Sequence, residues 1–397
     1  VFVSYVVFFF LYLADKARPF AEQDMAQLRA FASTHLQLND LQAWDLPYAS
    51  EKLREQQYAF SEQEVKNYFP LQKSLAGLFR VIESLFKVQL VAQPKAQVWH
   101  KDVQYFEVKN SNGQTIGGVY LDPYARPGKN SGAWMDEVRV RRQLGDAVQT
   151  PVAHMVCNFT APLQNEADTY LYHDDLLTLF HESGHALHHL LTQVGDMDVS
   201  GIRGVEWDAV ELPSQFMENF CWDYEVLSSM SAHAQTGEVL PRALFDKMLA
   251  AKNFQSGMQM LRQVEFSLYD LRLHAEYAPE QKELIFDIMN DVRKRVSVVP
   301  VPEFNRFAHS FSHIFAGGYS AGYFSYKWAE VLSADVFAQF ESAHAQGAPL
   351  LNPELGQKYW RDILSVGGSR PAMDSFRAFV GREPNVDALL RHSGLMA

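Results

Sequence analysis

The sequence predicts a mainly α-helical protein with one small β-sheet inserted before its most distinctive helix. Apolar residues recur at helical spacing in residues 14–90, and again from about residue 174 to the end. Between these parts, residues 103–125 (VQYFEVKNSNGQTIGGVYLDPYA) alternate apolar and polar side chains around Asn112 and Gly113. An Asn-Gly pair between two alternating runs is typical of a β-hairpin. The change of period marks the sheet within an otherwise helical chain.

The first part of the chain predicts two helical blocks. Residues 14–36 place Leu28, Phe31 and Leu36 on one side of a helix, and a second block from about residue 50 to residue 86 is broken at Pro70. Residues 1–13 (VFVSYVVFFFLYL) form an apolar run too short to span a bilayer, without the features of a signal peptide. We interpret this run as the internal start of a longer chain. A buried helix and a truncated membrane helix are the alternatives.

The predicted sheet has a further strand at residues 150–160 (TPVAHMVCNFT), after a glycine-rich loop at residues 126–134. We expect the sheet to be antiparallel and to lie beside the helix that follows it. An edge near residues 115–121 or 150–159 would let it align a peptide as an added strand. The chain therefore divides into a helical region at 1–95, a sheet region at 96–162 and a second helical region at 163–397.

The composition narrows the class of protein. Of the 397 residues, 47% are hydrophobic and 21% charged, enough apolar material for a large core. The net charge is −12 and no run of Lys or Arg occurs, which argues against nucleic acid or an anionic membrane as partner. Cys157 and Cys221 form no CxxC pair, which favours a reducing compartment, and we expect a cytoplasmic protein.

Residues 173–191 (HDDLLTLFHESGHALHHLL) contain the pattern His-Glu-x-x-His on a predicted helix. His181 and His185 are four residues apart, so they share one helix face and can hold one metal ion. Glu182 is the next residue after His181 on the helix and can reach a water molecule bound to the metal. Zinc lowers the pKa of bound water to about 7, so the Glu182 carboxylate can remove its proton as general base. The pattern predicts one Zn²⁺ per chain. An amphipathic helix with ordinary packed or solvated histidines is the alternative.

Carboxylates that follow the motif offer a third metal ligand. Residues 204–220 (GVEWDAVELPSQFMENF) contain four of them. A second helix packed on the motif helix could place one carboxylate on the metal and another behind a histidine. Spacing alone leaves the choice between Glu211 and Glu218 open. His188 and His189 cannot comfortably share an ion with His181, and we expect them to pack beside the site.

Four segments occur in the order typical of one enzyme family: HESGH, VELPSQFMEN, HIFAGGYSAGY and GREPNVDALL. With them, the chain from about Ala14 onward resembles the thimet oligopeptidase and neurolysin family of zinc metallopeptidases, in its bacterial oligopeptidase A branch. The resemblance implies that Glu211 is the third zinc ligand and that Glu218 supports a ligand. It also implies that His313, Tyr319 and Tyr326 line the active site, where a tyrosine hydroxyl stabilises an oxyanion. Ser183 stands where the family usually carries Phe.

The resemblance implies a neurolysin-like helical zincin that cuts short oligopeptides, such as degradation products and cleaved signal peptides. A dipeptidyl carboxypeptidase of the same family and a catalytically inactive helical binding module are the alternatives. It also implies that the chain is the catalytic portion of a longer peptidase whose N-terminal part is missing. We therefore expect the truncated chain to expose apolar surface and to associate.

Overall fold

The computed structural model describes residues 2–59, 61–162 and 168–396, so Val1 lies outside the described part. The chain folds into two compact units. Unit 1 comprises Val1–Phe60, Asp246–Trp328 and Leu389–Ala397, and unit 2 comprises Ser61–Phe245 and Ala329–Ala388. Helices dominate both units, which confirms the mainly α class.

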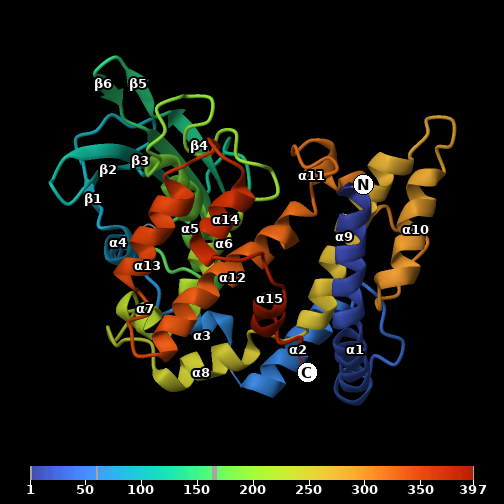
Figure 1. Ribbon diagram of the computed structural model, residues 1–397. Coiled ribbons are helices and arrows are strands. Elements are labelled where there is room, and N and C mark those ends of the chain that lie inside the picture. Colours follow the sequence, from blue (N-terminus) through green and yellow to red (C-terminus); the bar gives the residue numbers. More distant parts are fainter. Residues whose placement is uncertain (1, 60, 163–167, 397) are drawn as a thin grey trace. The chain divides into compact units, whose positions relative to one another are not determined.

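Unit 1 is built on two long helices, α1 (Phe2–Leu36) and α9 (Ser256–Glu276), which lie side by side (Figure 1). They approach closely at Gly257, where an added Cβ would lie 2.5 Å from the backbone nitrogen of Ala21. Leu28 and Phe31 of α1 are buried against α2 (Leu46–Tyr58), as their spacing predicts. The unit also contains α10 (Leu284–Val296), a short 3₁₀ turn (Phe307–Ser310) and α11 (Ser312–Phe315).

Residues 2–13 of the apolar run form the beginning of α1. Phe10 and Leu13 are fully buried, whereas Tyr5 and Phe8 are 71% and 70% exposed. The run therefore serves as a packing helix on one side only. No helix in the described part of the chain has the length and apolar character of a membrane span.

Unit 2 holds a five-stranded sheet with the strand order β1-β2-β3-β7-β4, gathered at one end of the unit (Figure 1). The strands are β1 (Gln89–Ala92), β2 (Gln104–Lys109), β3 (Thr115–Tyr124), β4 (Trp134–Arg139) and β7 (Val152–Phe159). A separate hairpin consists of β5 (Arg142–Leu144) and β6 (Ala147–Gln149). The hairpin predicted around Asn112 and the strand predicted at 150–160 are both confirmed.

Two details of the predicted sheet are wrong. The sheet is mixed, because β7 runs parallel to β3 while the other pairs are antiparallel. The chain reaches the outer strand β4 first and then returns between β3 and β4, which strand periodicity cannot reveal. As a result, residues 115–121 and 150–159 belong to interior strands, and β1 and β4 form the edges. In addition, β1 lies within the region expected to be helical.

The rest of unit 2 is mainly helical. Pro70 breaks the second helical block as predicted, with α3 (Glu62–Lys66) before it and α4 (Leu71–Phe86) directly after it. The motif helix α5 (His173–Leu190) contacts β7, β4 and α6 (Leu212–Glu218). The remaining elements are a 3₁₀ turn (Asn219–Trp222), α7 (Tyr224–Ser229), α13 (Pro353–Tyr359), a π-helical turn (Trp360–Leu364) and α14 (Ala372–Val380).

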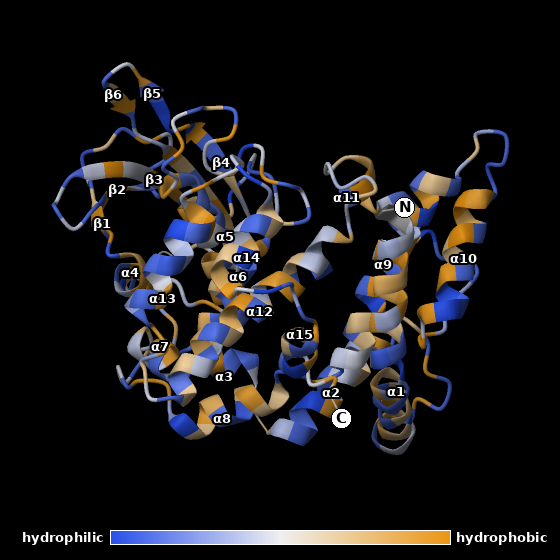
Figure 2. Cartoon of the chain, viewed as in Figure 1, coloured by the Kyte–Doolittle hydropathy of each residue, from blue (hydrophilic) through white to orange (hydrophobic). Residues whose placement is uncertain are grey.

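Three helices contain residues of both units: α8 (Arg242–Ala251), α12 (Ser325–Ala345) and α15 (Asp387–His392). Apolar and polar residues alternate along the helices at the expected period, which is plain for α10 in Figure 2. In that helix, Ile288, Met289, Val292 and Val296 are buried.

Candidate metal centre

Helix α5 presents the His-Glu-x-x-His motif because its apolar face packs into unit 2. Leu176, Leu179 and Phe180 are fully buried. Asp175 lies in the first turn and accepts a hydrogen bond from the backbone N–H of Tyr172 at 2.9 Å, satisfying a donor at the helix start. The helix is thus fixed at its beginning and along one side, and the motif follows two turns later.

The three predicted metal ligands meet in unit 2. The Nε2 atoms of His181 and His185 lie 3.3 and 3.2 Å from the same carboxylate oxygen of Glu211. Potential ligand atoms of all three side chains lie within 4.8 Å of one another. Within the described residues, no other group of three His, Cys, Asp or Glu side chains meets this criterion. Two imidazole nitrogens and one carboxylate oxygen are a donor set that suits zinc, with room for a fourth ligand.

Close packing of α5 on α6 brings Glu211 to the two histidines. A Cβ added at Gly184, inside the motif, would lie 2.2 Å from the carbonyl oxygen of Pro213, so only glycine permits this approach. Glu211 directly precedes α6, and the Ser214 hydroxyl lies 2.9 Å from its Oε2 and 2.8 Å from its backbone oxygen. Gly184 and Ser214 were not among the residues predicted from the sequence. A glycine inside a helix, which costs about 1 kcal/mol relative to alanine, was the available signal.

Glu218, at the end of α6, supports His181 from behind. Its Oε1 lies 2.6 Å from Nδ1 of His181, the ring nitrogen that faces away from Glu211. A carboxylate in this position fixes the tautomer and the ring orientation of a metal-binding histidine. Burial raises the pKa of Glu218, against the lowering effect of His181, and the nearby charge of Glu330 adds to the rise.

The electrostatics of the cluster favour a cation. Burial alone would lower the pKa of His181, but hydrogen bonds to Glu211 and Glu218 outweigh it and raise this pKa to about 10. Burial would raise the pKa of Glu211, yet the two histidines hold it well below its usual range. The two carboxylates therefore stabilise positive charge on the His181 ring, and a metal ion bound at its Nε2 would take the place of a proton there.

Glu182 is buried beside this cluster and is only 4% exposed. Burial raises its pKa, while His181 and His185 act in the opposite direction. Its Oε2 has no hydrogen-bond partner among the described residues, and the same holds for Nδ1 of His185. An ionisable carboxyl with an unused oxygen next to a metal-binding cluster is suited to accept a proton.

The other sequence candidates near the motif have different surroundings. His188 is buried, and burial lowers its pKa to about 3. His189 is fully buried and its Nε2 lies 2.9 Å from the backbone oxygen of Arg139, which joins α5 to the edge strand β4. Glu206 accepts from the backbone N–H of Ala372 at the start of α14. None of these is part of the His181–His185–Glu211 group.

The remaining candidate residues lie in unit 1, on and beside the glycine-rich loop between α11 and α12: His313 in α11, Tyr319 in the loop and Tyr326 in the first turn of α12. The rings of Tyr319 and Tyr326 stack with centroids 4.7 Å apart, and His313 lies 6.2 and 6.4 Å from them. Tyr323, which our reading of the sequence did not select, contacts both His313 and Tyr326. The loop and the two helices that flank it thus bring all three predicted residues into one aromatic cluster.

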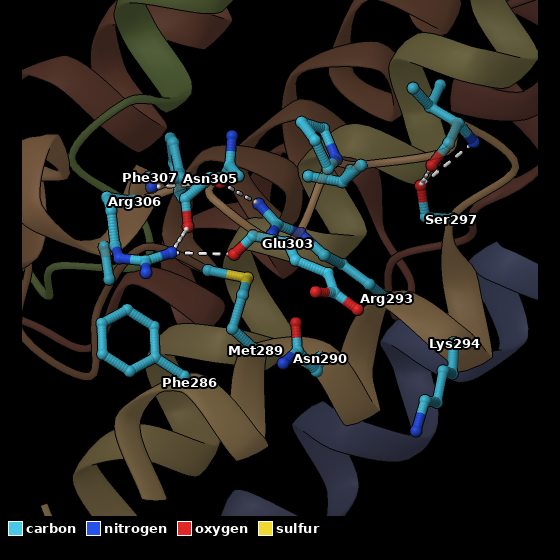
Figure 3. A pocket seen from close by; sticks show the side chains of 14 residues that line it. Phe286, Met289, Asn290, Arg293, Lys294, Ser297, Glu303, Asn305, Arg306 and Phe307 are labelled. Carbon is cyan, nitrogen blue, oxygen red and sulfur yellow. Dashed lines mark hydrogen bonds between the residues drawn. The ribbon is translucent and has the colours of Figure 1, made fainter. Parts of the chain in front are cut away.

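A hollow of about 670 Å³ in unit 1 lies apart from these residues, between α10 and residues 297–308 (Figure 3). Arg293 projects into it but donates to Glu265 at 2.9 Å and to Asn305 at 3.2 Å. Arg306 donates to two backbone oxygens and lies over the ring of Phe286. Because both guanidinium groups already have partners in the protein, we assign no ligand to this hollow.

A helix that carries His-Glu-x-x-His, completed by a carboxylate from a following helix, is the arrangement of a metalloprotease centre. Comparison with known proteins agrees with this class. The family model of peptidase family M3 matches residues 3–395. The chain belongs to peptidase family M3.

Named relatives differ in their stated activities. Oligopeptidase A of Escherichia coli (strain K12) is 49% identical over 384 residues, which cover 96% of this chain and 56% of the relative. Saccharolysin of Saccharomyces cerevisiae is 31% identical, covering 89% of this chain and 50% of the relative. Dipeptidyl carboxypeptidase of Salmonella typhimurium is 33% identical, covering 89% of this chain and 51% of the relative. The chain spans about half the length of the curated relatives it matches.

Proposed function

We propose that the protein is a zinc-dependent oligopeptidase that hydrolyses short peptides at internal bonds. The observation that carries the proposal is the convergence of His181, His185 and Glu211, with Glu182 buried beside them. Membership of peptidase family M3 and the similarity to oligopeptidase A support the substrate class. Peptide degradation products and cleaved signal peptides are the substrates we expect.

His181, His185 and Glu211 would hold one Zn²⁺. When bound, the ion supplies a Lewis acid that polarises a carbonyl and makes water acidic near neutral pH. Glu182 accepts the proton of the attacking water and then delivers a proton to the leaving amine. Glu218 keeps His181 in the tautomer whose Nε2 is free to bind the metal, and Ser214 holds the Glu211 carboxylate in place.

We propose that Tyr326 donates its hydroxyl to the oxyanion that forms on the substrate carbonyl, with Tyr319 or His313 assisting. A phenol is a neutral donor at pH 7, and a donor aimed at developing charge lowers the barrier. The stacking of Tyr319 on Tyr326 supports this role because it restricts the orientation of both rings.

The substrate backbone would add to the sheet at β4. In the described residues β4 pairs only with β7, so its outer edge is available for main-chain hydrogen bonds. The hydrogen bond between His189 and the backbone oxygen of Arg139 ties this edge strand to the motif helix. The edge strand replaces the two segments that the sequence had suggested.

Three broader features also belong to the proposal. The fold would be a neurolysin-like zincin, with the sheet beside the motif helix. The chain would be the catalytic portion of a longer peptidase, divided as the sequence predicts, and would associate through apolar side chains such as Tyr5 and Phe8. Cys157 and Cys221 are buried free thiols, which suits a reducing, cytoplasmic compartment.

A second candidate activity is that of a dipeptidyl carboxypeptidase, favoured by the 33% identity to the Salmonella enzyme of that name. Product analysis on a peptide of ten residues separates the two activities. Internal cleavage with fragments of several lengths supports the oligopeptidase, and release of C-terminal dipeptides alone supports the alternative.

The proposed function is tested with Glu182→Gln, since glutamine keeps the size but cannot accept the proton. We expect the variant to bind zinc like the wild type and to lose about 10²–10⁴-fold in kcat on a quenched fluorescent peptide. Glu206→Gln, which alters a carboxylate at the start of α14, is the matched control and should keep its rate. Full activity in Glu182→Gln would refute the mechanism, and a wild-type chain without stoichiometric zinc would support an inactive binding module.

A further inference from the structure

A buried carboxylate in unit 1 holds the loop that carries the aromatic cluster. Asp270, in the middle of α9, is 0% exposed. Its Oδ1 accepts from the backbone N–H of Ala321 and its Oδ2 from the backbone N–H of Tyr323, both at 2.9 Å. Carboxylates that accept backbone N–H groups make hydrogen bonds about twice as strong as neutral ones. The link joins residues about fifty positions apart in the sequence.

The loop needs such a link because its conformation is unfavourable by itself. Ala321 has a φ of +53°, a left-handed conformation that costs a non-glycine residue about 1 kcal/mol or more. Gly318 also has a positive φ, of +85°. The loop has local backbone hydrogen bonds, such as Tyr319 N–H to His313 oxygen at 3.0 Å. Asp270, on a long helix, adds two hydrogen bonds to this loop. One is to the strained residue Ala321 and the other is to Tyr323, two positions later.

The two bound amides lie between the stacked tyrosines in the sequence. Ala321 follows Tyr319 by two residues, and Tyr323 precedes Tyr326 by three. The Tyr323 ring contacts His313 and Tyr326, and its hydroxyl donates to Gln263 of α9 at 3.1 Å. A displacement of the Asp270 bonds would therefore move the backbone on which Tyr319 and Tyr326 depend.

His274 braces the carboxylate from one turn further along α9. Its Nδ1 lies 2.9 Å from Oδ1 of Asp270 and 2.9 Å from the Asp270 backbone oxygen. Burial raises the pKa of Asp270, while the two backbone N–H groups and His274 oppose this effect. Two backbone N–H groups and the His274 ring thus surround one buried carboxylate.

We propose that Asp270, braced by His274, is a positioning residue that holds the loop at residues 316–323 so that Tyr319 and Tyr326 keep their catalytic arrangement. The inference rests on the proposed function, since it assigns Asp270 an effect on the reaction through the tyrosines. It makes two separable claims: Asp270 protects the loop backbone, and this protection matters for the rate.

The first claim is tested by hydrogen exchange of Asp270→Asn in the full 397-residue chain. Asparagine has the same shape, but its NH₂ group would face one of the two N–H donors. We expect the amides of Ala321 and Tyr323 to exchange at least tenfold faster. Glu265→Gln is the matched control, because Glu265 is also buried in α9 but binds Arg262 and Arg293 instead of the loop. Equal loop protection in Asp270→Asn and Glu265→Gln would overturn the anchor.

The second claim is tested by kinetics on the same variants. We expect Asp270→Asn to lower kcat by about 10–100-fold with little change in KM, as loss of alignment near a reacting group can cost about 10²-fold. Combined with Tyr326→Phe, the Asp270→Asn effect should shrink to less than threefold, because the residue acts through that tyrosine. Fully additive effects would indicate general damage to the fold and contradict the inference.

His274→Gln gives an independent variant should Asp270→Asn fold poorly. It keeps the carboxylate but removes the imidazole, so faster loop exchange and a smaller fall in kcat are expected. Unchanged exchange and an unchanged kcat would oppose the role of His274. If Tyr326→Phe alone leaves kcat unchanged, the proposed catalytic function of the tyrosine fails, whereas the exchange result on Asp270 still stands or falls by itself.

Discussion

The two groups of candidate residues are held in opposite ways. The metal-binding side chains of unit 2 come from α5 and from the residue that precedes α6, where the two helices are pressed together at Gly184. Glu218 further fixes His181, and Ser214 further fixes Glu211. The tyrosines of unit 1 sit on and next to a glycine-rich loop that contains a left-handed alanine. A buried carboxylate from α9 supplies the two long-range backbone bonds of that loop.

The difference suggests a division of tasks. Metal ligands must keep fixed distances to one ion, and helix packing provides such rigidity. A loop that meets a substrate must admit it and release it, and loops with few buried contacts open more easily. If this is correct, changes in α5 and α6 should act on metal affinity, and changes in the loop should act on the rate with the metal retained.

The largest effect is expected for Glu211→Ala. This change removes one of three protein ligands and leaves Ser214 without its carboxylate partner, so zinc should be lost almost completely after dialysis. Metal analysis of the purified variant measures this directly. A variant that keeps one zinc per chain would show that Glu211 is not a ligand.

Glu218→Ala tests the metal centre of unit 2 further, through the residue that supports His181. Because Glu218 contacts the nitrogen of His181 that faces away from Glu211, zinc affinity should fall by about 10–100-fold instead of being abolished. Competition with a fluorescent chelator gives the affinity. Complete loss of zinc here, with retention in Glu211→Ala, would reverse the two roles.

Tyr326→Phe tests the tyrosine cluster of unit 1. The change removes one hydroxyl, so zinc content and melting temperature should match the wild type. We expect kcat to fall by about 10²–10³-fold at nearly constant KM, if the hydroxyl acts only on the oxyanion. An increase in KM at constant kcat would mean that the hydroxyl binds the ground-state substrate.

Gly184→Ala tests the packing argument without touching a ligand. The new methyl group would meet the Pro213 backbone and force α5 and α6 apart, at a cost of about 1–3 kcal/mol in stability. Calorimetry should show a lower melting temperature and zinc titration a lower zinc affinity. Ser183→Ala on the same helix serves as the control. Unchanged zinc affinity would separate the glycine from the metal centre.

The smallest effect is expected for Ser183→Val. Ser183 lines an apolar cavity of about 30 Å³ between α4, the sheet and α5. Partial filling should stabilise the chain by about 0.5–1 kcal/mol without changing zinc affinity. Thermal unfolding of Ser183→Val, compared with Ser183→Ala, measures this change in stability. A valine variant less stable than the wild type would mean that the cavity cannot accept the larger side chain.

The sequence predicted the parts of this molecule that depend on local pattern. The motif helix, the hairpin at Asn112 and the helix break at Pro70 follow from periodicity and turn chemistry. The position of β7 between β3 and β4 does not, because strand order depends on long-range pairing. Gly184, Ser214 and Asp270 escaped notice for the same reason: their partners lie in other elements, and one sequence contains no record of those contacts.

We propose that His181, His185 and Glu211 form one zinc site in this chain. Isothermal titration of the chelator-treated 397-residue protein with Zn²⁺ tests it most directly, with His185→Ala measured in parallel. We expect a single binding event at one zinc per chain in the wild type, and loss of that event in the variant. Binding of equal strength and stoichiometry in His185→Ala would contradict it.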